Sequence, residues 1–211
     1  MSDIKAIIFD MDGVLIEAKE WHYEALNRAL ALFGMEISRY DHLVTYDGLP
    51  TKTKLKMLSM ERGLPESLHS FINDMKQLYT TEVIYAKCKP TFHHQFALTR
   101  LHAQGYRLAV CSNSIRHTVL MMLDRANLLP LLDFYLSNED VPRPKPAPDM
   151  YIEAIRRLNL TPSECLIVED NPNGIKAARE SGAHVLCVND VRDVNFLNIS
   201  GEIERLKAMH A

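Results

Sequence analysis

The stretch of sequence that decides the fold class is AIIFDMDG, at residues 6–13. Its first four residues are all apolar, which is typical of a parallel β-strand buried on both faces of a sheet. Asp10, Asp12 and Gly13 complete the stretch, so the predicted strand ends in an acidic turn. The sequence therefore predicts a buried strand that delivers carboxylates at its carboxyl end.

Similar short apolar runs recur along the chain, and helical patterns lie between them. The runs predict further strands at 108–111, 166–168 and 185–188, with a weaker one at 134–136. Helices are expected at 91–104, 149–158 and 173–181, and the final residues, 202–211, also have a helical pattern. Strands that alternate with helices indicate βαβ units, so we expect an α/β fold with a Rossmann-like parallel sheet.

Residues 18 to about 86 interrupt this alternation and contain only helical patterns. The expected helices lie at 20–33, around Asp41, at 51–62 and at 65–85. About 70 residues are too many for an ordinary crossover between two strands. We therefore predict a catalytic core formed by residues 1–16 and 87–211, with a helical domain, residues 17–86, inserted after the first strand.

Composition excludes several classes of protein. The chain has 211 residues, 47% of them hydrophobic, and a formal net charge of −3. This balance lacks the basic surface that nucleic-acid binding needs, so no nucleic-acid partner is expected. The sequence contains no apolar run of about 18 residues for a membrane span and no recognisable signal peptide. We expect a cytoplasmic protein that is a monomer or a weak homodimer.

The four cysteines also indicate an intracellular protein. Cys88, Cys111, Cys165 and Cys187 form no CxxC pair and lie mostly within apolar runs. Such thiols are usually buried and reduced in intracellular proteins. We therefore predict buried thiols rather than disulfides or a metal centre.

Polar residues follow each strand that is expected to face the ligand crevice. In open α/β sheets this crevice lies outside the carboxyl ends of the strands. The residues are, in chain order, Asp10 and Asp12, Ser112 and Asn113, Lys145, and Glu169 and Asp170. The sequence therefore predicts a functional site at this edge of the sheet.

The charges of these residues indicate a metal ion. Four carboxylates would meet near Lys145, and like charges at short range cannot all stay ionised without compensation. A divalent cation would supply that compensation, and a set of oxygen ligands without histidine or cysteine favours Mg²⁺ over zinc. We therefore predict a Mg²⁺ site formed by Asp10, Asp12, Glu169 and Asp170.

Four stretches of the chain resemble, in order, the motifs of the haloacid dehalogenase-like (HAD) hydrolase superfamily. They are FDMDGV at 9–14, CSNS at 111–114, RPKPAPDMY at 143–151 and LIVEDNPNGIKAA at 166–178. The resemblance spans essentially the whole chain, because the inserted helices resemble the helical C1 cap of that family. It implies the HAD fold with a cap, a Mg²⁺ cofactor, and hydrolysis of a small-molecule phosphate ester.

The resemblance also implies a role for each core residue. Asp10 would attack phosphorus and form an aspartyl-phosphate, while Asp12 would act as general acid and then as general base. Ser112 would hold a phosphate oxygen, and Lys145 would neutralise the charge of the transferring group. Metal ligands would be the Asp10 and Asp170 side chains and the Asp12 main-chain carbonyl, with Glu169 binding the ion directly or through another group.

Other residues are candidates for binding the substrate. Asn113 and Arg116 lie next to the expected phosphate loop, His22 matches a position at which related caps often carry histidine, and Lys52 lies in a stretch that resembles the specificity loop of the cap. Ser112 has a second interpretation, because its hydroxyl could cap the helix expected to begin near Ser114.

Two alternatives to a phosphatase stay open. One is phosphoryl transfer of the β-phosphoglucomutase type, although the cap-loop arginine of mutases is matched here by Thr51. The other is a regulator that binds phosphate or metal without turnover. Haloacid dehalogenase activity itself is disfavoured, because those enzymes lack an acid at the position of Asp12. A phosphatase acting on a sugar, polyol or nucleotide phosphate is the interpretation that the motifs favour.

Overall fold

The computed structural model describes residues 3–209, which fall into two compact units. The sheet unit comprises Met1–Glu17 and Lys89–Ala211, and the helical unit comprises Ala18–Cys88. The chain leaves the sheet unit after the first strand and returns to it before the second. Each unit has its own buried apolar cluster.

The sheet unit contains five parallel strands in the order β3-β2-β1-β4-β5. They are β1 (Ala6–Phe9), β2 (Arg107–Cys111), β3 (Phe134–Leu136), β4 (Cys165–Glu169) and β5 (His184–Cys187). This confirms the predicted α/β fold, including its weakest strand. Phe9 pairs with Val110 of β2 and with Val168 of β4, so the three strands end within one residue of one another. The residues that follow them therefore emerge at one edge of the sheet.

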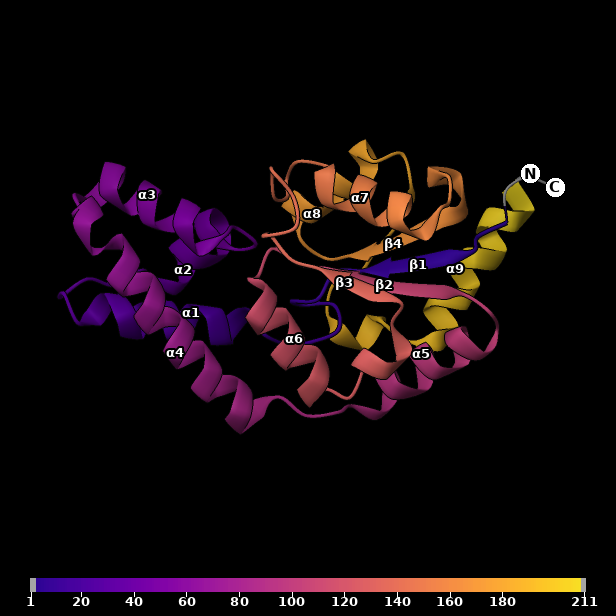
Figure 1. Ribbon diagram of the computed structural model, residues 1–211, viewed down its shortest axis with the longest axis horizontal. Coiled ribbons are helices and arrows are strands. Elements are labelled where there is room, and N and C mark those ends of the chain that lie inside the picture. Colours follow the sequence, from indigo (N-terminus) through magenta and orange to yellow (C-terminus); the bar gives the residue numbers. More distant parts are fainter. Residues whose placement is uncertain (1–2, 210–211) are drawn as a thin grey trace. The chain divides into compact units, whose positions relative to one another are not determined.

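Helices cover both faces of this sheet (Figure 1). They are α5 (Phe92–Ala103), α6 (Arg116–Arg125), α7 (Asp149–Leu158), α8 (Pro172–Glu180) and α9 (Phe196–Met209), with short 3₁₀ turns η3 (Leu129–Leu131), η4 (Pro162–Glu164) and η5 (Val191–Asp193). Figure 1 shows α7 and α8 on one face and α5, α6 and α9 on the other. The last helix begins earlier than predicted, and residues 210–211 of that prediction lie outside the described residues.

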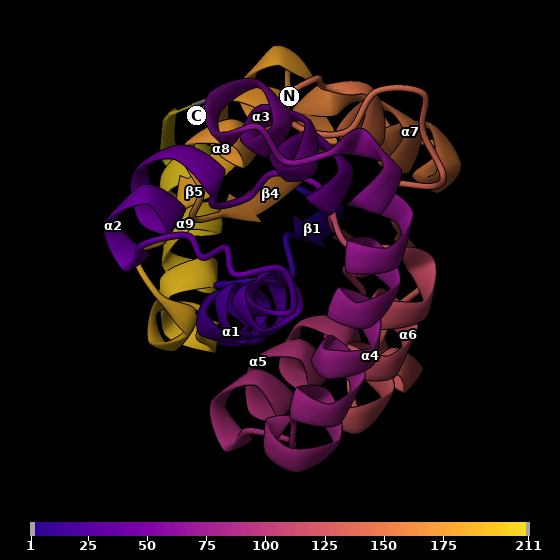
Figure 2. The same ribbon diagram turned by 90° about the vertical axis from the view of Figure 1, so that its left-hand side faces the viewer.

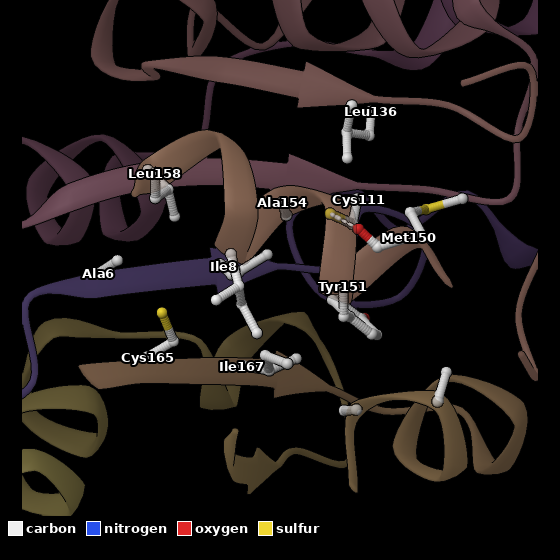
Figure 3. Packing of buried hydrophobic residues seen from close by; sticks show 13 residues of the cluster. Ala6, Ile8, Cys111, Leu136, Met150, Tyr151, Ala154, Leu158, Cys165 and Ile167 are labelled. Carbon is white, nitrogen blue, oxygen red and sulfur yellow. Dashed lines mark hydrogen bonds between the residues drawn. The ribbon is translucent and has the colours of Figure 1, made fainter. Parts of the chain in front are cut away.

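The α7 face of the sheet carries a tightly buried apolar cluster. Ile8 and Ile167 from neighbouring strands lie close to Met150, Tyr151 and Ala154 of α7 (Figure 3). All five residues are fully buried. Tyr151 is the one member of this group with a hydroxyl, and a buried hydroxyl usually has a hydrogen-bond partner. Its partner lies at the end of β4, as described below.

The helical unit is built of α1 (Lys19–Ala31), α2 (Arg39–Asp41), the π-helix η1 (His42–Tyr46), α3 (Thr51–Arg62), the 3₁₀ turn η2 (Glu66–Leu68) and α4 (His69–Lys87). Helices α1 and α4 pack against each other (Figure 2), and Leu30, Leu55 and Ile72 belong to the apolar cluster of this unit. The helix predicted over 65–85 is divided into η2 and α4. Helix α3 ends at Gly63, whose φ of 70° closes it in the left-handed conformation.

Two expectations from composition can be compared with the structure. Among residues 3–209 no helix is both long and apolar enough to cross a membrane. Cys88, Cys111 and Cys165 are buried free thiols, but Cys187 is exposed. The prediction of a buried thiol is wrong for Cys187 because its strand, β5, lies at the edge of the sheet.

Candidate active site at the carboxyl edge of the sheet

The turn after β1 fixes the position of Asp10. The Asp10 backbone N–H donates to the carbonyl of Val168 at 2.9 Å, which continues the pairing of β1 with β4 by one residue. The Met11 carbonyl then accepts the N–H groups of Leu15 and Ile16 at 3.0 and 2.9 Å. Gly13 has a φ of 91°, which a residue with a side chain rarely adopts. The DxDG sequence is therefore folded into a tight turn at the strand end.

Lys145 joins two of the predicted acidic residues. Its Nζ lies 2.6 Å from Asp10 Oδ1 and 2.7 Å from Glu169 Oε1, and it also donates to the Cys111 carbonyl at 2.9 Å. An ammonium has three protons, so these contacts use its whole donor capacity. The Lys145 side chain is only 3% exposed. The structure thus places the lysine of the third motif between the acids of the first and fourth.

The pKa values of this group follow from burial and from its neighbours. Burial raises the pKa of Asp10 well above its usual value; the Lys145 ammonium opposes this, whereas the carboxylates of Glu169, Asp170 and Asp12 add to it. Burial alone would lower the pKa of Lys145, but Asp10 and Glu169 raise it above its usual value. The site therefore keeps Lys145 charged, and it has an excess of negative charge that a cation would stabilise.

Glu169 is held by four hydrogen bonds. Its Oε1 accepts from Lys145 Nζ and, at 2.8 Å, from the Tyr151 hydroxyl. Its Oε2 accepts from the backbone N–H groups of Asp170 and Asn171 at 3.0 and 3.1 Å. A Cβ at Gly174 of α8 would overlap this carboxylate. Tyr151 and Gly174 both lie within the quoted motifs, but neither was among the predicted site residues.

Asp12 points toward the loop after β2. Its Oδ2 accepts a hydrogen bond from Ser114 Oγ at 3.1 Å and a longer one from Ser112 Oγ at 3.4 Å. Ser112 Oγ also accepts from the Ser114 N–H at 3.0 Å. The alternative interpretation of Ser112 as a helix cap is wrong, because α6 begins at Arg116 and its N-cap residue is Ile115. The two serine hydroxyls of this loop therefore donate hydrogen bonds to the Asp12 carboxylate.

Asn113 and Arg116 have protein partners in this structure. The Asn113 side chain donates to the Lys145 carbonyl and accepts from the Lys145 N–H, both at 3.0 Å. It therefore fixes the backbone of Lys145. The Arg116 guanidinium pairs with Asp140 at 2.9 Å and is largely exposed. A role of either residue in substrate binding stays a prediction.

The two substrate-binding candidates of the helical unit have different environments. Lys52 is exposed on α3, while His22 is half-buried on α1. His22 Nδ1 lies 3.2 Å from Nζ of Lys76 on α4. Lys54, which lies on the same helix as Lys52 and was not among the predicted candidates, is buried.

Three carboxylates of the sheet unit converge closely enough to hold one metal ion. Oxygen atoms of Asp10, Glu169 and Asp170 lie within 4.8 Å of one another. A purely carboxylate set suits a hard divalent cation. The Asp12 carboxylate is not part of this group, since it turns toward Ser112 and Ser114. The residues present therefore fit a divalent metal.

Comparison with known proteins identifies the family. The sequence model described as "Haloacid dehalogenase-like hydrolase" matches residues 7–188. The chain therefore belongs to the haloacid dehalogenase-like hydrolases, which confirms the resemblance seen in its motifs and makes it an enzyme of the hydrolase class.

Individual relatives agree with this assignment. The chain is 28% identical to a phosphoglycolate phosphatase of Nitrosospira multiformis, over 96% of this chain and 92% of that protein. It is 26% identical to a phosphorylated carbohydrates phosphatase of Thermotoga maritima, over 97% and 94% of the two chains. The crystal structure of β-phosphoglucomutase from Clostridium difficile matches with a TM-score of 0.83 and 18% identity, over 97% and 99% of the chains. This last similarity concerns the fold.

Proposed function

We propose that this protein is a Mg²⁺-dependent phosphatase that hydrolyses a small phosphorylated metabolite through an aspartyl-phosphate. The observation that carries the proposal is the position of Lys145, whose Nζ lies 2.6 Å from Asp10 beside the carboxylate group that fits a metal. A buried carboxylate next to a buried ammonium and a cation site is suited to attack a phosphate dianion. The names of the two phosphatase relatives support the same chemistry.

In the first step, an Asp10 oxygen forms a bond to phosphorus while the bond between phosphorus and the ester oxygen breaks. Asp12 gives its proton to the leaving oxygen and so becomes a carboxylate. Ser112 and the backbone N–H that follows it hold a phosphate oxygen. Lys145 neutralises part of the negative charge that gathers on the transferring group.

In the second step, Asp12 accepts a proton from water while the water oxygen attacks phosphorus. The bond between phosphorus and Asp10 breaks, and inorganic phosphate leaves. Both steps need Asp12 near the phosphoryl group, and the hydroxyls of Ser112 and Ser114 offer it hydrogen bonds that orient it. The residue thus returns to its protonated form, ready for the next substrate molecule.

Asp10 and Asp170 would hold the Mg²⁺ ion with their side chains, and Asp12 would hold it with its main-chain carbonyl. When bound, the ion would withdraw charge from a phosphate oxygen and balance the surrounding carboxylates. Both oxygens of Glu169 already accept two hydrogen bonds each. We therefore assign Glu169 to orienting Lys145 rather than to binding the metal directly.

We further propose that residues 17–86 act as a cap that selects the substrate, with His22 and Lys52 among its candidate contacts. The substrate would be a small-molecule phosphate ester. The protein itself would be a cytoplasmic monomer or weak homodimer. Hydrolysis is favoured over phosphoryl transfer between sugar positions because Thr51 stands where mutases carry arginine.

Phosphate release from a panel of phosphorylated metabolites, with Mg²⁺ and with a chelator, tests the proposal. We expect turnover of at least one compound class that the chelator abolishes. Asp10→Asn and Asp12→Asn should each lose turnover by at least about 1,000-fold. Full activity of Asp10→Asn would overturn the assignment of the nucleophile, and a sugar phosphate that isomerises without releasing phosphate would indicate a mutase.

A further inference from the structure

The loop after β2 directs two serine hydroxyls at one oxygen of Asp12. Ser114 Oγ lies 3.1 Å and Ser112 Oγ lies 3.4 Å from Asp12 Oδ2, and all three residues belong to the sheet unit. A hydroxyl has a single proton to donate, so each contact uses the whole donor capacity of its serine. The two contacts therefore have different fates if one of the hydroxyls gains a second acceptor.

Ser112 gains such an acceptor in the proposed reaction. Its hydroxyl is assigned to hold a phosphate oxygen, and the oxygens of a phosphate ester dianion only accept hydrogen bonds. Ser112 must therefore turn its proton from Asp12 to the substrate. The contact that it gives up is the longer and weaker of the two that reach Asp12.

Ser114 is anchored in a way that preserves its contact with Asp12. Its N–H donates to Ser112 Oγ at 3.0 Å, and its carbonyl accepts the N–H of Asn138, in the loop after β3, at 3.2 Å. The Asn138 side chain also donates to the Asn113 carbonyl at 2.8 Å. The mechanism assigns no phosphate contact to Ser114. Its hydroxyl can therefore stay on Asp12 while Ser112 changes its partner.

The contact at Oδ2 also decides which oxygen of Asp12 transfers a proton. A neutral carboxyl group carries its proton on one oxygen, and the other oxygen is the better acceptor. A hydroxyl that donates to Oδ2 therefore favours the form with the proton on Oδ1. The same hydrogen bond restricts rotation of the carboxyl group, and such preorganisation lowers the barrier of a proton transfer.

We propose that Ser114 is a positioning residue for Asp12 in both proton transfers. Asp12 Oδ1 gives its proton to the leaving oxygen, which also takes the electron pair of the broken bond to phosphorus. In the second step Oδ1 accepts a proton from the attacking water, while Ser114 keeps its own proton throughout. The inference rests on the proposed phosphatase function and adds the residue that orients its acid and base.

Two esters with different leaving groups test the role of Ser114. An alkyl phosphate from the metabolite panel needs a proton on its leaving oxygen, whereas 4-nitrophenyl phosphate releases a stable anion. The value of kcat/KM reports this first step, because departure of the leaving group leaves the phosphoryl group on Asp10. We expect Ser114→Ala to lower kcat/KM by about tenfold or more for the alkyl ester and by less than about threefold for the nitrophenyl ester.

Two further variants at this position examine the hydroxyl itself. Ser114→Thr retains the hydroxyl, so the ratio of the alkyl to the nitrophenyl kcat/KM should stay within about threefold of the parent value. If Ser114→Ala does not fold, Ser114→Cys replaces it. Because a thiol is a weaker donor than a hydroxyl, Ser114→Cys should lower the same ratio, although by less.

Ser137→Ala is the matched control. Ser137 is buried, directly follows β3 and donates to Asp140 Oδ2 at 2.6 Å. The control therefore also loses a hydrogen bond between a serine hydroxyl and a carboxylate, but at a carboxylate without a part in the mechanism. It should change kcat/KM for the two esters equally and leave their ratio at the parent value.

The possible results separate this role from the phosphatase proposal. An unchanged ratio in the folded Ser114→Ala variant, whether both values fall or neither falls, would overturn the role of Ser114 and leave the phosphatase proposal standing. A ratio that falls as far in Ser114→Thr as in Ser114→Ala would also overturn it, because the hydroxyl would then not be the cause. If the parent releases phosphate from no ester with Mg²⁺, the phosphatase proposal itself fails, and the role of Ser114 fails with it.

Discussion

The carboxylate of Glu169 occupies the space in which a side chain at Gly174 would have to lie. Gly174 is in α8, directly after the strand that carries Glu169, so the approach of helix and carboxylate depends on a missing Cβ. This close approach leaves Glu169 Oε1 directed at Lys145 and Tyr151. The position of the lysine beside Asp10 therefore depends on a residue that does not contact Asp10.

Gly174→Ala is the first prediction. The added methyl must displace Glu169 or shift α8, so we expect the free energy of unfolding to fall by about 1–3 kcal/mol. Phosphate release should fall by at least about tenfold, because Lys145 loses one of its two carboxylate partners. Gly201→Ala is the control, since nothing lies within 4 Å of a Cβ at that position of α9. For Gly201→Ala we expect the free energy of unfolding to rise by about 0.5–1 kcal/mol. Equal stabilities of the two variants would contradict the prediction.

Tyr151→Phe removes a hydroxyl and leaves the packing of the ring intact. The lost hydrogen bond reaches a buried carboxylate, and such bonds contribute about 2 kcal/mol to stability. We therefore expect urea denaturation to show a free energy of unfolding lower by this amount, and we expect a lower kcat. Lys145 and two backbone N–H groups still hold Glu169 in the variant. Tyr40→Phe, at an exposed position of the helical unit, should change neither quantity. An unchanged midpoint for Tyr151→Phe would show that the hydrogen bond contributes nothing.

Mg²⁺ should stabilise the folded chain by mass action. At a concentration of 100 times its dissociation constant, a ligand of the folded state adds about 2.7 kcal/mol. We expect thermal unfolding to shift upward with MgCl₂ relative to NaCl of equal ionic strength. Asp170→Asn should remove most of that shift, whereas Asp124→Asn, on the exposed face of α6, should retain it. A shift that survives in Asp170→Asn would place the cation elsewhere.

His94 predicts a pH dependence of stability that is separate from the candidate active site. It is buried between Thr91 and the Val191 carbonyl, with Nδ1 2.9 Å from the Thr91 hydroxyl and Nε2 2.9 Å from the carbonyl oxygen. Burial lowers the pKa of His94 to about 4; the neighbouring His93 adds to this, and the bond to Val191 opposes it.

The unfolded chain therefore binds more protons than the folded chain between pH 6.5 and about 4. The neutral His94 makes its full contribution to the free energy of unfolding above pH 6.5. That contribution is lost as the pH falls through this range, and the loss amounts to at most about 3 kcal/mol. Urea denaturation at a series of pH values should show a shallower loss for His94→Gln than for the parent. His117→Gln, at an exposed position, should follow the parent. Parallel curves for all three proteins would refute the prediction.

Much of the fold could be predicted because its signals are local. The apolar run at 6–9 needs no partner to indicate a buried strand, and the Pro and Gly residues at helix ends act through their own backbone preferences. The same holds for Asp10, Asp12, Lys145, Glu169 and Asp170. Asp10, Asp12, Glu169 and Asp170 lie at or just beyond the ends of β1 and β4, and Lys145 lies in the loop after β3. Because parallel strands bring their carboxyl ends to one edge, the strand order indicates that these residues lie near one another.

The tertiary structure decided which atoms those residues use. The sequence by itself determined that Glu169 lies at the candidate site. The orientation of its carboxylate depends on hydrogen bonds from Lys145, from Tyr151 and from the backbone N–H of Asp170. Lys145 and Tyr151 lie far from Glu169 in the chain, and the periodicity of the sequence does not predict such contacts. It also determined that basic residues occur near position 52, while packing buries Lys54 and leaves Lys52 exposed. Helix periodicity separates these two side chains onto different faces, and only the neighbouring elements determine which face is covered.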